Sequence, residues 1–210
     1  MLGADGVANL VIGRLRDRMP GRVALIRDRY GIDVNALPDI ELFKAYEPTS
    51  MSVEKWPAVY VEIDDTAGKT GAQRESMQGA YDVYSFRYRV RVYVMARTLT
   101  GHLEGNEVEP MIRRYIAAAQ EAVIPGLILV ADDVHGQHAT TDPNTLKQVY
   151  GAPQFGQDVA EIIGSARLEF EVKTTEEIEA VPGPLAPPPD GEPAAVLEGI
   201  YLFGPGEVIV

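Results

Sequence analysis

The side chains of this chain that could do chemistry gather in three short segments. The first, Asp132 to His138, reads Asp-Asp-Val-His-Gly-Gln-His and brings together carboxylates and imidazoles, which are ligands of divalent metals. Its spacing matches no strong metal motif, so we expect a solvated acidic turn and no metal ligands. The chain has three histidines and no cysteine. Histidine acid–base chemistry therefore has few positions, and thiolate chemistry and disulfides are excluded.

The second segment, residues 67–70, reads Ala-Gly-Lys-Thr and resembles the end of a phosphate-binding loop. Such a loop needs a glycine five positions before Gly68, so that the backbone can curl around phosphate, but Ile63 stands there. The adjacent carboxylates Glu176 and Glu177 face opposite sides of a strand and cannot share a substrate. No Gly-x-Ser-x-Gly elbow is present. We therefore expect that the protein is not an enzyme and that it has no catalytic residue and no cofactor.

The third segment carries arginines at alternate positions, which share one face of a predicted strand: Arg87, Arg89 and Arg91. Two other predicted strands carry carboxylates at alternate positions: Glu62, Asp64, Glu169 and Glu171. If these strands are antiparallel neighbours, the arginines pair with carboxylates across strands within one subunit. The same pairing between subunits of a ring would make all seven residues interface candidates. Contact with DNA is a third interpretation.

The composition limits the classes of function and partner that the sequence allows. The chain has 210 residues, of which 46% are hydrophobic and 24% charged, as in globular proteins. Its net charge of −12 disfavours broad binding to nucleic acid. No apolar run approaches the roughly 20 residues of a membrane helix, so we expect no membrane partner. The opening residues have no positive charge before their apolar stretch, so no signal peptide is expected.

The charge is unevenly distributed along the chain. Residues 1–110 hold 14 Lys/Arg and 16 Asp/Glu, whereas residues 111–210 hold 5 and 15. The first 30 residues are basic and contain six arginines. Such polarity suits a subunit that meets other proteins through complementary faces, although ordinary solvated faces would give the same pattern.

The helices are predicted from apolar spacing. Asp5 is a candidate cap for an opening helix, Pro20-Gly21 interrupts it, and a second stretch ends at Gly31. Residues 106–123 form the clearest helix, with Asn106 as the N-cap, Pro110 in the first turn and an apolar face. Residues 32–56 read as a connection, because prolines break any longer pattern.

The strands are predicted from alternation. Residues 57–64 and 81–97 alternate apolar and polar side chains and, with a polar loop at 65–79, form a long hairpin. Residues 127–130 read as a short buried strand, residues 132–156 as loop-rich, and the region around 168–172 as another strand. The predicted core is Val59, Val61, Ile63, Phe86, Tyr88, Val90, Val92, Ile112, Ile116, Leu168, Phe170 and Val172.

These elements predict an α+β fold. A mainly antiparallel sheet with a long hairpin packs against an N-terminal and a central amphipathic helix, within a domain of residues 1–180. Residues 181–193, which are rich in proline, read as an extended linker. Residues 194–210 are apolar and form either an extended C-terminal arm or a strand or hairpin that returns to its own domain.

The order of elements resembles the tail terminator, or tail completion, proteins of long-tailed bacteriophages. The resemblance covers residues 5–178 and rests on the Pro-Ala-Val-Tyr-Val-Glu-Ile strand at 57–63, the strand at 86–94, the helix at 106–123 and the strand at 166–172. Residues 181–210 exceed the usual compact size of that family. The resemblance implies a structural virion protein of the neck, made in the host cytoplasm.

In that family the subunits form a hexameric ring at the head-proximal end of the tail tube. The resemblance therefore implies four kinds of partner: copies of this chain, the tail tube protein, a head-completion or connector protein, and DNA only as passing cargo. An acidic ring lumen would not hold DNA. The alternatives are another neck or tail component, such as a stopper or a tail-tube subunit, and a metal-dependent enzyme using the segment Asp132 to His138.

Overall fold

The computed structural model describes residues 3–45, 55–66, 72–78, 81–99, 108–126, 128–132, 137–152, 154–155 and 161–179. They form two helices and eight strands, which follow in chain order: α1 (Gly3–Tyr30), β1 (Leu42–Ala45), β2 (Ala58–Thr66), β3 (Ala72–Gln78), β4 (Tyr81–Leu99), α2 (Val108–Val123), β5 (Ile128–Asp132), β6 (Gln137–Tyr150), β7 (Gln154–Phe155) and β8 (Glu161–Glu179). Linker 181–193 and segment 194–210 lie outside these residues.

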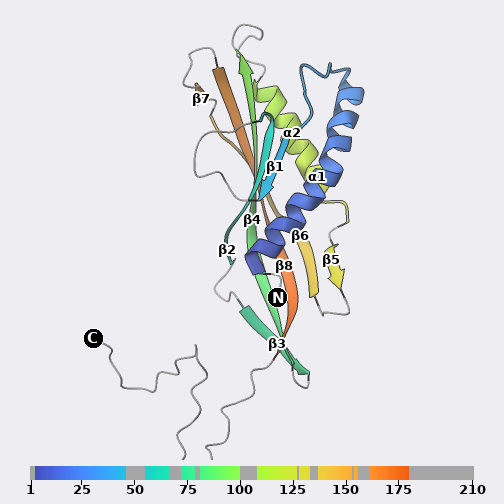
Figure 1. Cartoon of the computed structure of the whole chain (residues 1–210), viewed down its shortest axis with the longest axis vertical. Helices are drawn as coiled ribbons and strands as arrows, with labels where there is room; N and C mark the ends of the chain where they lie inside the picture. The colour runs from blue at the N-terminus through green and yellow to red at the C-terminus, as the bar shows by residue number, and fades with distance from the viewer. Residues whose placement is uncertain are drawn as a thin grey trace, which may run out of the picture. The chain divides into compact units, whose positions relative to one another are not determined.

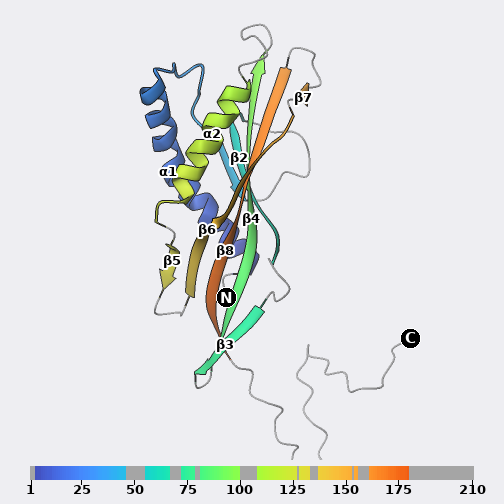
Figure 2. The same ribbon diagram turned by 180° about the vertical axis from the view of Figure 1, so that it is seen from behind.

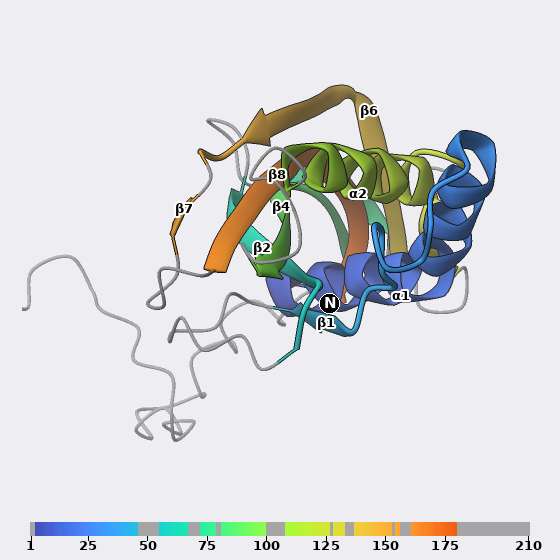
Figure 3. The ribbon, with the colours of Figure 1, turned by 90° about the horizontal axis from the view of Figure 1, so that it is seen from above.

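All described strands join one sheet of order β1-β2-β4-β8-β6-β5, with β3 also paired to β4 and β7 to β8. Every pairing is antiparallel except that of β1 with β2. The sheet curls, and both helices pack on its concave side (Figure 3). The predictions of an α+β fold and of a mainly antiparallel sheet are confirmed. No described helix is long and apolar enough to cross a membrane.

The two longest strands, β4 and β8, form the centre of the sheet (Figures 1 and 2). They pair without a register shift from Tyr81↔Glu179 to Leu99↔Glu161. On the other side of β4, β2 pairs from Ala58↔Met95 to Thr66↔Tyr88. The expected loop at 65–79 is wrong in part, because residues 72–78 form β3 and continue along β4 where β2 ends. Residues 67–71 lie outside the description.

Helix α1 is continuous, so the predicted interruption at Pro20-Gly21 is wrong. Proline removes one backbone donor inside a helix, but Met19 and Val23 on either side are fully buried. Their burial outweighs the lost hydrogen bond. Gly31 ends the helix as predicted, at φ 61°, with backbone hydrogen bonds from Gly31 to Asp28 and from Ile32 to Arg27. Asp5 lies inside the first turn and is not a cap.

Helix α2 presents one apolar face to the sheet and one to α1. Its buried residues include Ile112, Tyr115 and Ile116, and Pro110 lies in the first turn as predicted. The predicted cap Asn106 lies outside the described residues. Next along the chain, β5 is an edge strand, and Ile128 within it is 53% exposed. The strand predicted at 127–130 is therefore present as β5, but the expectation that it is buried is wrong at Ile128.

The predicted loop at 132–156 is also wrong, because most of it forms β6, which pairs with β8. The register shifts between Asp142 and Lys147, so the missing N–H of Pro143 costs the ladder nothing. Asp142 accepts a hydrogen bond from the Asn144 backbone N–H at 2.9 Å. The Thr145 hydroxyl accepts the backbone N–H of Glu171 at 2.8 Å. Side chains thus replace the ladder bonds where the strand bulges.

The core lies between the helices and the concave side of the sheet. Ten of the twelve predicted core residues are at most 4% exposed, and Ile63 and Phe86 are partly buried against them. Helix α1 adds a row of buried side chains, among them Val11, Leu15 and Val23. The inward side chains of β2, β4 and β8 are therefore committed to the core, and their outward side chains form a separate surface.

Candidate functional site: a charged sheet face and a groove between the helices

The convex face of the central strands carries the charged residues that the sequence singled out. In β4, inward Tyr88, Val90 and Val92 are buried, so the alternate arginines must point outward. The same alternation in β2 and β8 places the carboxylates on that face. The register sets Arg91 opposite both Glu62 and Glu169. All seven predicted residues therefore lie on one face, which we call the charged sheet face.

Ion pairs cross the strands on this face. They join Arg91 Nη2 to Asp64 Oδ2 at 2.6 Å, Arg91 Nε to Glu169 Oε1 at 3.7 Å, Arg89 Nη1 to Asp64 Oδ2 at 3.8 Å and Arg87 Nη1 to Glu171 Oε2 at 3.8 Å. Cross-strand pairing within one chain, one of the three interpretations of the arginine row, is therefore present. Glu62 differs from the other carboxylates, because it accepts a hydrogen bond from the Tyr93 hydroxyl at 3.1 Å.

The charges are held most firmly at Arg91 and loosen toward Arg87. Partial burial lowers the pKa of Arg91, but Asp64, Tyr93 and Glu169 more than offset it, so the pKa is raised. Its guanidinium stays charged between two carboxylates. The side chain of Arg91 is 24% exposed, whereas that of Arg87 is 59% exposed. Arg87 also stands directly opposite Lys173, so this end of the row is more basic.

Hydrogen bonding on this face is incomplete. The Nε atoms of Arg91 and Arg167 are buried and have no hydrogen-bond acceptor among the described residues. Arg167 Nε nevertheless lies 2.6 Å from Glu169, which therefore serves two arginines. Attraction without good hydrogen-bond geometry therefore holds these charges near one another, although the two buried Nε atoms donate no hydrogen bond.

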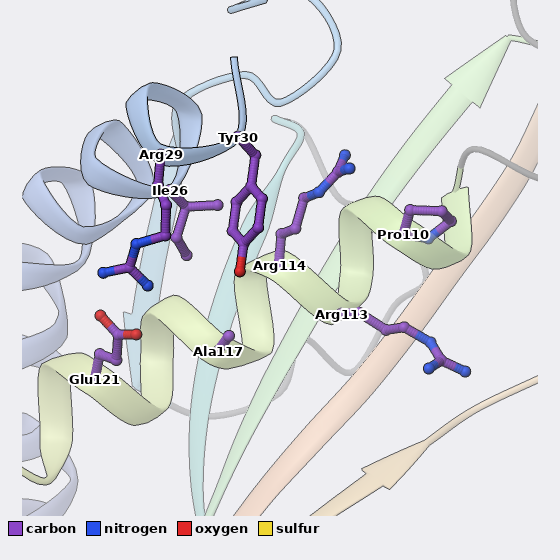
Figure 4. A pocket seen from close by; sticks show the side chains of 8 residues that line it. All are labelled: Ile26, Arg29, Tyr30, Pro110, Arg113, Arg114, Ala117 and Glu121. Carbon is purple, nitrogen blue, oxygen red and sulfur yellow. The ribbon is translucent and has the colours of Figure 1, made fainter. Parts of the chain in front are cut away.

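A groove between the two helices was missed by sequence reasoning (Figure 4). It has a volume of about 350 Å³ and is lined by Ile26, Arg29 and Tyr30 of α1 and by Pro110, Arg113, Arg114, Ala117 and Glu121 of α2. We call it the helix groove. The sequence signal for this groove was the pair of adjacent arginines at 113–114, on a helix whose other face is apolar. The second wall of the groove is the C-terminal half of α1, which the sequence predicted to be a separate helix.

The helix groove contains more arginines than carboxylates. Arg113 points away from the groove and pairs with Glu109 at 2.6 Å (Figure 4). Glu121 lies 3.8 Å from Arg22, and Figure 4 shows Arg29 pointing toward the same carboxylate. Arg114 lies beside the ring of Tyr30, which is 65% exposed (Figure 4). The lining thus holds three arginines and one carboxylate.

Most other arginines of the basic first helix make contacts within the same chain. Arg14 donates to the carbonyls of Gly126 and Ile128, and Arg18 donates to Pro125, so both bind the chain just after α2. Arg27 pairs with Asp39 at 2.6 Å. The arginines of the basic N-terminal segment therefore mostly hold α1 against neighbouring parts of the same chain.

The other chemical candidates do not form a site in the described part of the chain. No group of three or more metal-ligating side chains occurs among the described residues. Of the segment Asp132 to His138, residues 133–136 lie outside the description, and His138 pairs with Thr175 in the sheet. The Ala-Gly-Lys-Thr segment lies outside it entirely.

Comparison of the sequence with protein families and with curated proteins finds no match.

Proposed function

We propose that this chain is a structural, non-enzymatic subunit of a bacteriophage neck: a tail terminator that forms a ring on the head-proximal end of the tail tube. In that ring it would join the tube to the head connector. The observation that carries the proposal is the placement of two unlike charged surfaces on opposite sides of one sheet. The charged sheet face lies on the convex side, and the helix groove lies on the helical side.

A closed ring of identical subunits needs a head-to-tail interface, which requires two different surfaces on each copy. The charged sheet face suits one half of such an interface, because Arg87 and Arg89 are exposed and paired only at 3.8 Å. Loosely paired exposed charges contribute little to the stability of one subunit. They are therefore free to form charge-assisted contacts with a partner.

Among the alternatives, a tail-tube subunit would need a predominantly β architecture. The two helices here have 28 and 16 residues and cover the concave side of the sheet. The fold therefore favours a terminator or a head-completion subunit over a tube subunit.

The proposal is tested by native mass spectrometry of the purified chain, followed by electron-microscope imaging for rings. We expect a closed oligomer, which is stabilised further when the cognate tail tube is added. A strict monomer at every concentration, with and without tubes, would contradict the proposal. Rings that bind a connector but not a tube would favour the head-completion alternative.

A matched pair of variants separates the interface from the fold. Replacing Arg87→Gln together with Arg89→Gln should leave the melting temperature nearly unchanged but reduce the ring fraction, because both side chains are exposed and only loosely paired. The control is Arg16→Gln, which removes an exposed charge on α1 together with one long hydrogen bond to the Phe43 carbonyl. Equal ring loss in the pair and in the control would remove the charged sheet face from the interface.

A further inference from the structure

The helix groove has the character of a docking site for a short segment that is both acidic and apolar. Its apolar lining includes Ile26 and Ala117, and the exposed ring of Tyr30 lies above α2 (Figure 4). Its net charge is positive, because the lining sets Arg29 and Arg114 against the single carboxylate of Glu121, while Arg113 pairs with Glu109 outside it. An occupant would need carboxylates spaced among aliphatic or aromatic side chains.

The sequence of this chain contains one such segment. Residues 181–210 carry four acidic residues and no lysine, arginine or histidine. Residues 196–203 read Val-Leu-Glu-Gly-Ile-Tyr-Leu-Phe, so six apolar side chains flank the carboxylate of Glu198. The charge and the hydrophobicity of this segment both complement the groove.

We propose that residues 196–203 of one copy dock in the helix groove of a neighbouring copy, with Glu198 facing Arg29 and Arg114. The contact rests on the proposed ring, and it names the surface that each copy offers to its neighbour's C-terminal segment. It would work as an acidic, apolar anchor seated between two helices, a recurring mode of peptide recognition.

The length of the chain favours a neighbouring copy over the same copy. Strand β8 ends at Glu179, whereas α2 begins against Gly164, fifteen residues earlier on that strand. Fifteen strand residues span about 50 Å. The sixteen residues 180–195, if fully extended as a Pro-rich linker, also span about 50 Å. A copy could reach its own groove only with a largely extended linker, whereas the groove of a neighbouring copy need not lie that far from Glu179.

Disulfide trapping tests the contact cleanly, because the chain has no cysteine of its own. Full-length chains bearing Tyr30→Cys are mixed with full-length chains bearing Leu202→Cys, oxidised, and analysed by non-reducing electrophoresis. The matched control replaces Tyr30→Cys with Leu25→Cys, which is 52% exposed on the same helix but does not line the groove. We expect about tenfold more of the mixed disulfide with Tyr30→Cys than with the control.

Charge reversal then tests the recognition itself. Adding Arg29→Glu and Arg114→Glu to the Tyr30→Cys chain should lower the mixed disulfide about tenfold, because Glu198 would face like charges. Adding Glu198→Arg to the Leu202→Cys chain should restore much of it. Equal trapping by Leu25→Cys, or no recovery on the second reversal, would overturn the proposal.

Two further outcomes separate this contact from the ring. Native mass spectrometry of the same mixtures reports rings independently of the disulfide. Rings without the mixed disulfide would overturn the docking and leave the ring standing, whereas a monomer without the disulfide would overturn both. One chain carrying Tyr30→Cys and Leu202→Cys that closes on itself at high dilution would place the segment in its own groove, contrary to the proposal.

Discussion

Tyr115 joins helix α2 to the connection between α1 and β1 through one buried hydroxyl. The side chain is fully buried, and its hydroxyl donates to the Pro38 carbonyl at 2.6 Å. Tyr115→Phe removes the donor and leaves a buried acceptor, so we expect a loss of about 1–3 kcal/mol in the free energy of unfolding. Urea denaturation measures this loss. The control Tyr150→Phe, at a 45% exposed position, should change it by less than about 0.5 kcal/mol.

The same residue makes stability fall at alkaline pH. Burial raises the pKa of Tyr115, with Asp39 adding to the effect and Arg27 opposing it. Tyrosine ionises near pH 10 in the unfolded chain but at higher pH in the fold. The stabilisation is therefore complete below about pH 10 and is lost as the pH rises further. Urea midpoints measured across this range should fall less steeply for Tyr115→Phe, and an unchanged slope would contradict the assignment.

A charge at Ile116 should abolish folding. The side chain is fully buried in α2 against the sheet, and Ile116→Asp would place an uncompensated carboxylate there. We expect loss of the cooperative thermal transition. A soluble variant that melts at the wild-type temperature would show that this part of the core assignment is wrong.

Residue-level prediction succeeded where alternation was strict. In β4 every second side chain from Tyr84 to Ala96 is apolar, so one pattern specified both the buried Val90 and Val92 and the outward Arg89 and Arg91. It did not specify which carboxylate each arginine meets. The partner of each arginine depends on strand register, which places Glu62 opposite Arg91. Glu62 nevertheless accepts its hydrogen bond from the Tyr93 hydroxyl. Loose pairs such as Arg87 with Glu171 depend on rotamers that no sequence pattern encodes.

At the scale of elements, α2 approaches β8 closely at Gly164. A Cβ atom added there would lie 2.8 Å from Ile112 Cγ1 and still closer to Val108. Gly164→Ala should therefore cost about 1–3 kcal/mol through overpacking. Gly13→Ala is the opposite control, because nothing lies within 4 Å and the helix gains about 1 kcal/mol. Thermal melting distinguishes the two, and a stabilised Gly164→Ala would refute this close packing.

The elements that sequence reasoning missed are those in which tertiary contacts override local signals. Pro20 predicts a break, yet burial on both sides keeps α1 continuous. Strand β6 is polar and contains Pro143, yet its register shift falls at that residue and Thr145 supplies a hydroxyl to β8. The helix groove escaped prediction for the same reason, since it needs both halves of α1 to lie in one helix.

At the scale of the whole molecule, the core of the described part lies before Glu179. Deleting residues 181–210 should therefore leave a folded subunit whose unfolding is still cooperative but whose assembly is weakened. Circular dichroism melting and native mass spectrometry measure the two effects separately. Complete loss of the fold would show that the C-terminal segment returns to its own domain, the alternative that the sequence left open.

The unbroken ladder between β4 and β8 has a mechanical consequence. Nineteen residue pairs join the two strands, with hydrogen bonds that run perpendicular to the strand direction. A pull applied at opposite ends, at Tyr81 and Glu161, loads all of these bonds together in shear. A pull applied at one end, at Tyr81 and Glu179, opens them one at a time. The sheet is therefore stiff along these two strands and yields from their ends.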